Sequence, residues 1–222
     1  VIGNQVIDFV VDEATFRRDI MAARTFGFAH EVEALRQADV LVHDGLVDPR
    51  VLDLAPAGCQ RISVAKRRSR HTLPQESINA LIVAHVKTGA IVVRLKGGDP
   101  FIFGRGGEEV QSLRRAGIEP VVINGITSGL AAITSLGAPL THREHAQGVV
   151  FVTGHPQKDG PGLDWVRLGE SARDLRLTLV IYMGMSGAGT IQRELMRGLP
   201  GTTPAAVVQR ASLPDERHAL TT

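Results

Sequence analysis

Short apolar runs recur along the chain and predict β-strands. Each run is rich in valine, isoleucine, leucine or alanine and is bounded mainly by polar residues, glycine or proline, as buried strands are. The runs are residues 39–43, 61–65, 90–95, 119–123, 148–153, 177–183 and 205–209. Most connections between successive runs are long enough for a crossover helix, which favours parallel strands.

Several segments between these runs show the periodicity of amphipathic helices. In residues 74–88 a proline suits the first turn, apolar residues recur three and four positions apart, and a glycine follows the last turn. His85 lies on this apolar stripe, so we expect it to pack and not to bind a ligand. Residues 106–116 and 127–137 predict two further helices. Strands that alternate with helices predict an α/β fold with parallel sheets covered on both faces.

The pattern breaks at residues 137–147, a polar stretch that contains a proline. We place a domain boundary there and expect two α/β domains, residues 1–143 and 147–222. The chain contains no internal repeat and no low-complexity tract.

The composition indicates a folded protein of a reducing compartment. The 222 residues are 43% hydrophobic, which is enough to form a core. No apolar run approaches the roughly 18 residues of a membrane-spanning helix, and the N-terminus lacks the pattern of a secretory signal. Cys59 is the only cysteine, so neither an internal disulfide nor a cysteine-based metal site can form. We therefore expect a cytoplasmic protein without a membrane partner.

Basic residues gather at 66–71 and 113–117, although the net charge is only +2. Seven Phe, one Tyr and one Trp are the only aromatic residues apart from histidine, and none is interleaved with the basic residues for base stacking. The clusters therefore favour a small polyanionic ligand or a solvated basic face, and we do not expect nucleic acid as a partner.

Glycine is concentrated in residues 93–109, VRLKGGDPFIFGRGGEE, which run from a predicted strand into a predicted helix. Ligands of parallel α/β proteins bind beyond the carboxyl ends of the strands, and glycine lets a ligand approach the main chain. Asp99 offers an acceptor for a ribose hydroxyl or an ammonium group. The spacing differs from the dinucleotide fingerprint, and no P-loop motif occurs in the chain. A second glycine-rich run, 184–189, resembles such a turn only loosely.

His142 and His145 have a spacing that a metal site could use. They lack a carboxylate-rich partner motif, so we expect no metal.

Residues 93–109 resemble the signature of the uroporphyrinogen-III C-methyltransferases, which are members of the tetrapyrrole methylase family. Other segments agree with this family in order and spacing, and the resemblance covers roughly residues 31–222. These segments are ADVLVHDGLV (38–47), GITSGLAAITSLGAPLTHRE (125–144), TGH (153–155), LDW (163–165) and VIYMGM (180–185). The resemblance implies the tetrapyrrole methylase fold, in which two α/β domains enclose a cofactor cleft, and a homodimer.

The implied cofactor is S-adenosylmethionine, which is converted to S-adenosylhomocysteine. By position, the residues that would contact it are Gly97, Gly98, Asp99, Ile102, Thr127 and Ser128, with Met183 and Ala211 from the second domain. In this interpretation the glycines let the main chain hold the cofactor, while Phe101 and Phe103 pack beneath the loop.

The implied substrate is uroporphyrinogen III, a tetrapyrrole rich in carboxylates. Arg105 and Arg143 match positions that engage it, because guanidinium groups bind carboxylates through two hydrogen bonds. Glu108 would orient Arg105 or a pyrrole NH. The alternative for Arg105 and Glu108 is a surface ion pair across one helical turn.

The implied reaction is attack by a pyrrole carbon on a methyl sulfonium, at ring A and then at ring B, to give precorrin-2. Alignment and desolvation would supply most of the rate, and proton transfer would complete each step. Asp44 and Lys66 match the proton acceptor and the proton donor of the family. The alternatives are a turn-capping role for Asp44 and a place in a solvated basic run for Lys66.

The two ends of the chain depart from the family pattern. Residues 1–30 are atypical and lack the first glycine-rich loop of the form G-A-G-P-G-D, and the C-terminal domain is short, as if truncated. An alternative function is therefore a non-catalytic relative that binds a tetrapyrrole or S-adenosylmethionine. A methylase of a later corrinoid precursor is disfavoured by the sequence of the glycine-rich loop. The product would serve sirohaem or cobalamin biosynthesis.

Overall fold

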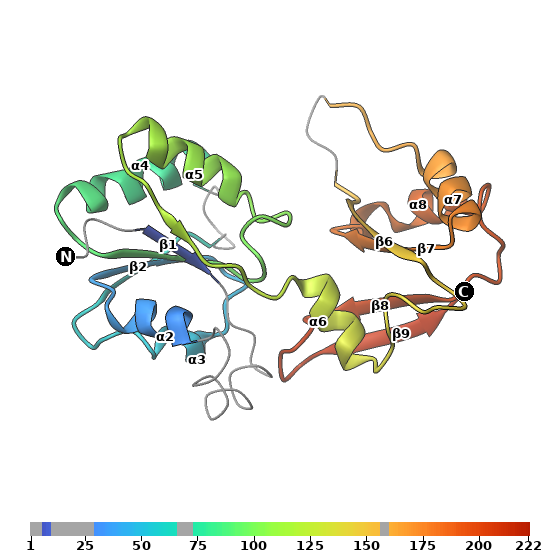
Figure 1. Ribbon diagram of the computed structural model, residues 1–222, viewed down its shortest axis with the longest axis horizontal. Helices are drawn as coiled ribbons and strands as arrows, with labels where there is room; N and C mark the ends of the chain where they lie inside the picture. Colours follow the sequence, from blue (N-terminus) through green and yellow to red (C-terminus); the bar gives the residue numbers. More distant parts are fainter. Residues whose placement is uncertain (1–5, 10–28, 66–72, 156–159) are drawn as a thin grey trace. The chain divides into compact units, whose positions relative to one another are not determined.

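The computed structural model describes residues 6–9, 29–65, 73–155 and 160–222, with side chains from residue 32 onward (Figure 1). By their contacts these residues form two compact units, residues 1–128 and 129–222, here called the first and second units. The division falls ahead of 137–147, where the sequence placed the boundary. Helix α6 (Ser128–Ser135) gives the reason, because the Gly129 amide donates to the Tyr182 hydroxyl at 2.8 Å and ties most of the helix to the second unit.

A parallel five-stranded sheet forms the centre of the first unit. Its strands stand in the order β3-β2-β4-β1-β5, and every hydrogen-bonded pair is parallel, as predicted. The strands are β1 (Val6–Phe9), β2 (Val40–His43), β3 (Gln60–Ser63), β4 (Val92–Leu95) and β5 (Val121–Val122). Strand β1, which the sequence analysis did not anticipate, pairs with both β4 and β5 and so lies inside the sheet.

Helices cover both faces of this sheet, as the apolar runs predicted (Figure 1). Helices α2 (Ala29–Arg36) and α3 (Pro49–Leu52) lie on one face, and α4 (Gln75–Lys87) and α5 (Gly106–Arg115) lie on the other. Successive side chains of each strand point to opposite faces of the sheet. Leu41 packs in the core beneath α2 and α3, whereas its neighbours Val40 and Val42 pack in the core beneath α4 and α5.

The predicted helices agree closely with α4, α5 and α6. The predictions were residues 74–88, 106–116 and 127–137. Each observed helix lies within its predicted range and begins at its first or second residue. Apolar spacing of three and four residues was therefore a sufficient signal where a glycine or proline marked the ends.

The second unit combines one parallel and one antiparallel pair of strands. Strands β6 (Gly148–Thr153) and β7 (Leu177–Tyr182) pair in parallel, and helices α7 (Trp165–Asp174) and α8 (Ala188–Leu195) follow them, the latter after the short 3-10 helix η1 (Met185–Gly187). Strands β8 (Ala205–Gln209) and β9 (Arg217–Thr221) are antiparallel.

The prediction of exclusively parallel sheets is therefore wrong for the β8–β9 pair. The connection between these strands is too short for a crossover, so only an antiparallel hairpin can form. Strand β9 was missed because its sequence, RHALT, has no apolar run.

Candidate active site

The loops that follow β4 and β5 meet at the carboxyl edge of the parallel sheet. A Cβ atom built on Gly98 would lie 3.8 Å from the Ser128 nitrogen and 3.9 Å from the Ile126 carbonyl oxygen. Gly97, Gly98, Thr127 and Ser128, which the sequence assigned to a common ligand, are thus brought together within the first unit. Thr127 is buried, and Ser128 is exposed.

Asp44 joins the end of β2 to the loop after β4. Its carboxylate accepts hydrogen bonds from the Leu46 amide at 2.9 Å and from the Gly97 amide at 3.4 Å. The turn-capping role that the sequence left open for Asp44 is therefore present. The side chain nevertheless stays half-buried at the edge where the predicted ligand residues gather.

Close contacts within the protein explain most of the glycines of this loop. A Cβ on Gly97 would lie 2.5 Å from the Leu46 Cβ, and a Cβ on Gly104 or Gly106 would lie 2.6 Å from the Pro100 carbonyl oxygen. The Gly106 amide donates to that same oxygen at 2.9 Å. The loop is folded on itself, so these glycines are required by its own backbone.

The expectation that Phe101 and Phe103 pack beneath the loop is wrong. Their exposed fractions are 59% and 39%, and the residue that fills the space below is the fully buried Pro100. The Asp99 carboxylate accepts a hydrogen bond from the Phe101 amide at 2.8 Å. In this tight turn Pro100 is buried and Phe101 is exposed. An aromatic side chain is therefore exposed two residues from Asp99 and next to the half-buried Ile102.

Arg105 and Glu108 form a bidentate ion pair at the start of α5. The Arg105 Nε and an Nη atom donate to the two Glu108 oxygens at 2.8 and 2.7 Å, and both side chains are more than half exposed. The hydrogen bonds from Arg105 lower the pKa of Glu108 and raise the pKa of Arg105. This geometry matches the surface pair that the sequence allowed as an alternative, and it also holds the guanidinium in a fixed position.

An open groove of about 770 Å³ lies along the junction of α4 and α5. Arg105 and Glu108 line it together with Gln75, Asn79 and Arg115. The predicted substrate residues of the first unit therefore face a groove whose lining is partly polar and partly apolar.

Sequence reasoning missed a buried charge network behind the glycine-rich loop. The Glu109 Oε1 atom accepts hydrogen bonds from Gln75 at 2.9 Å, Lys96 at 3.1 Å and Arg94 at 3.3 Å. The Arg94, Lys96 and Glu109 side chains are each no more than 7% exposed. Arg94 interrupts an apolar strand, and Glu109 shares a helical face with Val110 and Leu113. Charges at apolar positions were the signal that could have found the network.

The remaining predicted site residues lie elsewhere in the chain. Lys66 falls outside the described residues. Met183 directly follows β7 and is 56% exposed, and Ala211 lies half-buried in the turn between β8 and β9. Arg143 is exposed and makes no hydrogen bond or ion pair with any described residue. That Met183, Ala211 and Arg143 share a ligand with the first unit stays a prediction.

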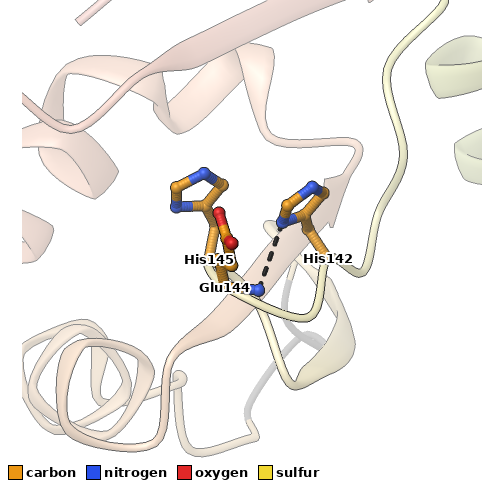
Figure 2. A group of neighbouring side chains, drawn as sticks. All are labelled: His142, Glu144 and His145. Atoms are coloured by element: carbon orange, nitrogen blue, oxygen red, sulfur yellow. Dashed lines mark hydrogen bonds between the residues drawn. The ribbon is translucent and has the colours of Figure 1, made fainter.

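His142 and His145, the pair considered for a metal, lie together with a carboxylate that was overlooked. Their rings stack with centroids 4.7 Å apart, and Glu144 projects from the same turn (Figure 2). The sequence analysis looked for a separate acidic motif, whereas this acid stands between the two histidines.

Comparison with known protein families gives a match over most of the chain. Residues 30–222 match the family described as tetrapyrrole (corrin/porphyrin) methylases. Residues 1–53 also match a second family, UDP-3-O-acyl N-acetylglycosamine deacetylase. This second match covers the region that the sequence analysis found atypical.

Individual relatives agree with the larger match. The chain is 50% identical over 184 residues to a sirohaem synthase of Hahella chejuensis, covering 82% of this chain but only 38% of that protein. A crystal structure of uroporphyrin-III C-methyltransferase from Thermus thermophilus is similar over 98% of this chain and 82% of its own, with a TM-score of 0.74 and 34% identity. A structure of that enzyme in complex with S-adenyl homocysteine is similar over 98% of this chain and 87% of its own, with a TM-score of 0.73 and 35% identity.

Within the described ranges, no helix is both long and apolar enough to cross a membrane.

Proposed function

This chain belongs to the tetrapyrrole methylase family and has its fold, and from that premise we propose that it methylates uroporphyrinogen III. The methyl donor is S-adenosylmethionine, rings A and B are the acceptors, and precorrin-2 for sirohaem or cobalamin synthesis is the product. The observation that carries the proposal is the contact at Gly98, because it gathers four predicted cofactor residues at one edge of the sheet. The Thermus complex with S-adenyl homocysteine supports a cofactor of this kind.

The residues at this edge fit S-adenosylmethionine. Gly98 has a φ of +115°, and no described atom comes within 3.8 Å of the position a Cβ would take, apart from its chain neighbours. Glycine accepts this positive φ without strain, and residues 126–128 lie in ordinary van der Waals contact with it, so Gly98 brings the main chains of the two loops together at the proposed nucleoside site. The Asp99 carboxylate offers an acceptor for a ribose hydroxyl or the ammonium group. When bound, S-adenosylmethionine supplies an electrophilic methyl group.

Asp44 is the proposed proton acceptor. Two backbone amides, those of Leu46 and Gly97, hold its carboxylate in place beside the glycine-rich loop. A fixed carboxylate can take the proton that a methylated pyrrole ring releases without first reorienting. Lys66 is the proposed proton donor, from its position in the family pattern.

Two arginines are proposed to bind the carboxylates of the substrate. Glu108 presets the Arg105 guanidinium at the groove between α4 and α5. Arg143 has no partner among the described residues, so both edges of its guanidinium are available to a carboxylate. Met183 and Ala211 complete the proposed cofactor contacts.

The proposal extends to a homodimer in the cytoplasm. The family resemblance supports the dimer, and sedimentation equilibrium of the purified chain tests it. The buried thiol of Cys59 forms no disulfide, which is compatible with a reducing compartment. Fractionation of cells that express the protein tests its location.

The experiment is transfer of labelled methyl from S-adenosylmethionine to uroporphyrinogen III under anaerobic conditions. We expect two methyl groups per tetrapyrrole, and loss of transfer in Asp99→Ala and Arg105→Ala. Arg114→Ala is the matched control, because Arg114 lies on α5, forms an exposed ion pair with Glu119 beyond the end of that helix, and does not line the groove. Equal loss in the control would remove the argument for Arg105.

A second candidate function is binding without catalysis. Residues 1–53 match another family, and the first glycine-rich loop of the methylases is missing from the sequence. Measurable binding of S-adenosylmethionine with no transfer would support this candidate. Absence of both binding and transfer would contradict both functions.

A further inference from the structure

Three side chains of metal-ligand type project from one turn of the second unit. His142, Glu144 and His145 each offer one donor atom, and these atoms lie within 4.8 Å of one another. Figure 2 shows the two rings and the carboxylate on the same short segment. Of the residues in this turn, the proposed methyl transfer uses only Arg143, so the grouping of His142, Glu144 and His145 calls for an explanation of its own.

The backbone of this turn is closed by hydrogen bonds. The His142 carbonyl oxygen accepts from the amides of His145 at 3.1 Å and Ala146 at 2.9 Å, and the His142 amide donates to the Ala146 oxygen at 2.8 Å. The spacing of the three side chains is therefore set by a tight turn. Side chains presented by such a turn lose little backbone entropy when they bind a ligand.

The flanks of the turn are also anchored. On one side the Thr178 hydroxyl donates to the Leu140 oxygen at 2.7 Å, and on the other the Gln147 amide donates to the Arg176 oxygen at 2.8 Å. Both partners lie at the start of β7, so the turn is fixed to the parallel pair of strands. A ligand bound there would be held by a rigid part of the second unit.

The donor set indicates which ion would bind. Two imidazoles and one carboxylate suit a borderline divalent ion, and the same set occurs in zinc sites that keep a fourth position open. We propose that this turn is a binding site for Zn²⁺ or a similar divalent transition-metal ion. His142, Glu144 and His145 are its protein ligands, and the remaining positions are open to water.

The site must contract slightly when the ion enters. Zinc bonds of about 2.0–2.1 Å place tetrahedral ligand atoms about 3.4 Å apart, so the donor atoms must approach one another. All three residues are exposed, so their side chains have room to rotate. The ion also competes with the hydrogen bond that the Glu144 amide donates to His142 Nδ1 at 3.2 Å, which is a long and weak bond.

Arg143 limits the affinity. Its guanidinium lies in the same turn and repels a cation, and no acidic residue is paired with it among the described residues. We therefore expect a weaker affinity than that of a structural zinc site. Arg143→Ala should bind the ion at least as tightly as the unchanged protein.

Titration of the untagged, metal-free chain with Zn²⁺ in a calorimeter tests the proposal. We expect one ion per chain, and at least a tenfold weaker affinity in His142→Ala and in His145→Ala. Glu144→Gln should weaken binding less. His218→Ala, which removes an exposed histidine of β9, is the matched control and should leave the affinity unchanged.

Co²⁺ supplies a readout of geometry. Tetrahedral Co²⁺ with nitrogen and oxygen ligands absorbs visible light much more strongly than octahedral aqueous Co²⁺, and this additional absorption should disappear in the His142→Ala/His145→Ala double variant. Circular dichroism of that variant checks that it is folded. An absence of stoichiometric binding, or binding that survives in the folded double variant, would overturn the proposal. Neither readout depends on methyl transfer, so the result stands apart from that of the proposed function.

Discussion

At the scale of single residues, the one carboxylate of Glu109 pairs with two buried cations. Arg94 and Lys96 both donate to its Oε1 atom, while Oε2 has no partner among the described residues. The network joins β4, α4 and α5 directly behind the glycine-rich loop. Its two cations have no other acid to pair with in the described part of the chain, so the network depends on Glu109.

Replacing Glu109 should destabilise the protein strongly. Glu109→Ala leaves the Arg94 and Lys96 charges buried and uncompensated, and the loss of one partner from a buried ion pair typically costs about 3–5 kcal/mol. We expect a decrease of this size in the free energy of unfolding, measured by urea denaturation.

The neighbouring acid provides the matched control. Glu108 is 52% exposed and pairs with an exposed arginine, so Glu108→Ala should cost at most about 1 kcal/mol. Equal effects of the two substitutions would contradict the importance of the buried network.

Several site residues could be placed from the sequence, and others could not. The resemblance predicted that Gly97, Gly98 and Thr127 contact one ligand; the structure brings the three together at one edge of the sheet, and their role stays a prediction. The network around Glu109 was missed, since burial of a charge is decided by contacts between elements distant in sequence. Phe101 was misplaced, because an aromatic residue in a loop has no periodicity that indicates which way it points.

At the scale of the elements, helix α5 begins with two glycines whose surroundings differ. A Cβ on Gly106 would lie 2.6 Å from the Pro100 oxygen, whereas a Cβ on Gly107 would meet nothing within 4 Å. The first glycine therefore belongs to the packing of the loop against the helix. The second occupies an ordinary helical position, where alanine is preferred.

These two positions should respond to alanine in opposite directions. Gly106→Ala forces the loop backbone away from α5 and should lower the free energy of unfolding by about 1–3 kcal/mol. Gly107→Ala should raise it by about 0.5–1 kcal/mol. Thermal denaturation of the two variants measures the difference, and a shift of the same sign in both would be inconsistent with the packing described.

Asp48 caps helix α3 and should make stability depend on pH. Its carboxylate accepts from the Arg50 amide at 2.9 Å and from the Arg50 side chain, and these hydrogen bonds lower the pKa of Asp48. Asp48→Ala should cost about 0.5–2 kcal/mol at neutral pH. Because the pKa of Asp48 is lower in the folded protein, its ionised carboxylate contributes stability at pH values above the pKa of the unfolded chain, near 3.8. This contribution is lost as the pH falls through the pKa of the folded protein.

Denaturation of Asp48→Ala and the unchanged protein between pH 7 and pH 2 tests this behaviour. The difference between them should be constant at neutral pH and should narrow at the acid end. A difference that stays constant over the whole range would mean that the charge of Asp48 does not contribute.

At the scale of the whole molecule, the described chain consists of two compact units with separate sheets. The number of α/β units, the parallel sheet of the first unit and its covered faces were predictable from alternating strands and helices. Strand β1 was missed, although residues 6–11, VIDFVV, form an apolar run like those that predicted the other strands, because this region matched no part of the family pattern. Its position between β4 and β5 is set by pairing and not by local preference.

Interrupting β1 should affect the first unit alone. Ile7→Pro removes an amide from a strand inside the sheet, where proline is not accommodated. We expect loss of amide protection in β4 and β5 and retention of protection in β6 and β7, measured by hydrogen exchange. Loss of protection in both sheets would show that the two units unfold together.

The contacts of Gly97, Gly104 and Gly106 also bear on how such a motif changes during evolution. A glycine that must avoid Leu46 or Pro100 is retained by selection for folding, even in a lineage in which catalysis is no longer needed. The glycine signature would then outlast the activity, and a pseudoenzyme descended from this family would still carry it. Residues such as Asp99, Arg105 and Arg143, whose side chains support no buried packing and whose proposed role is to bind ligands, would be the first to change in such a lineage.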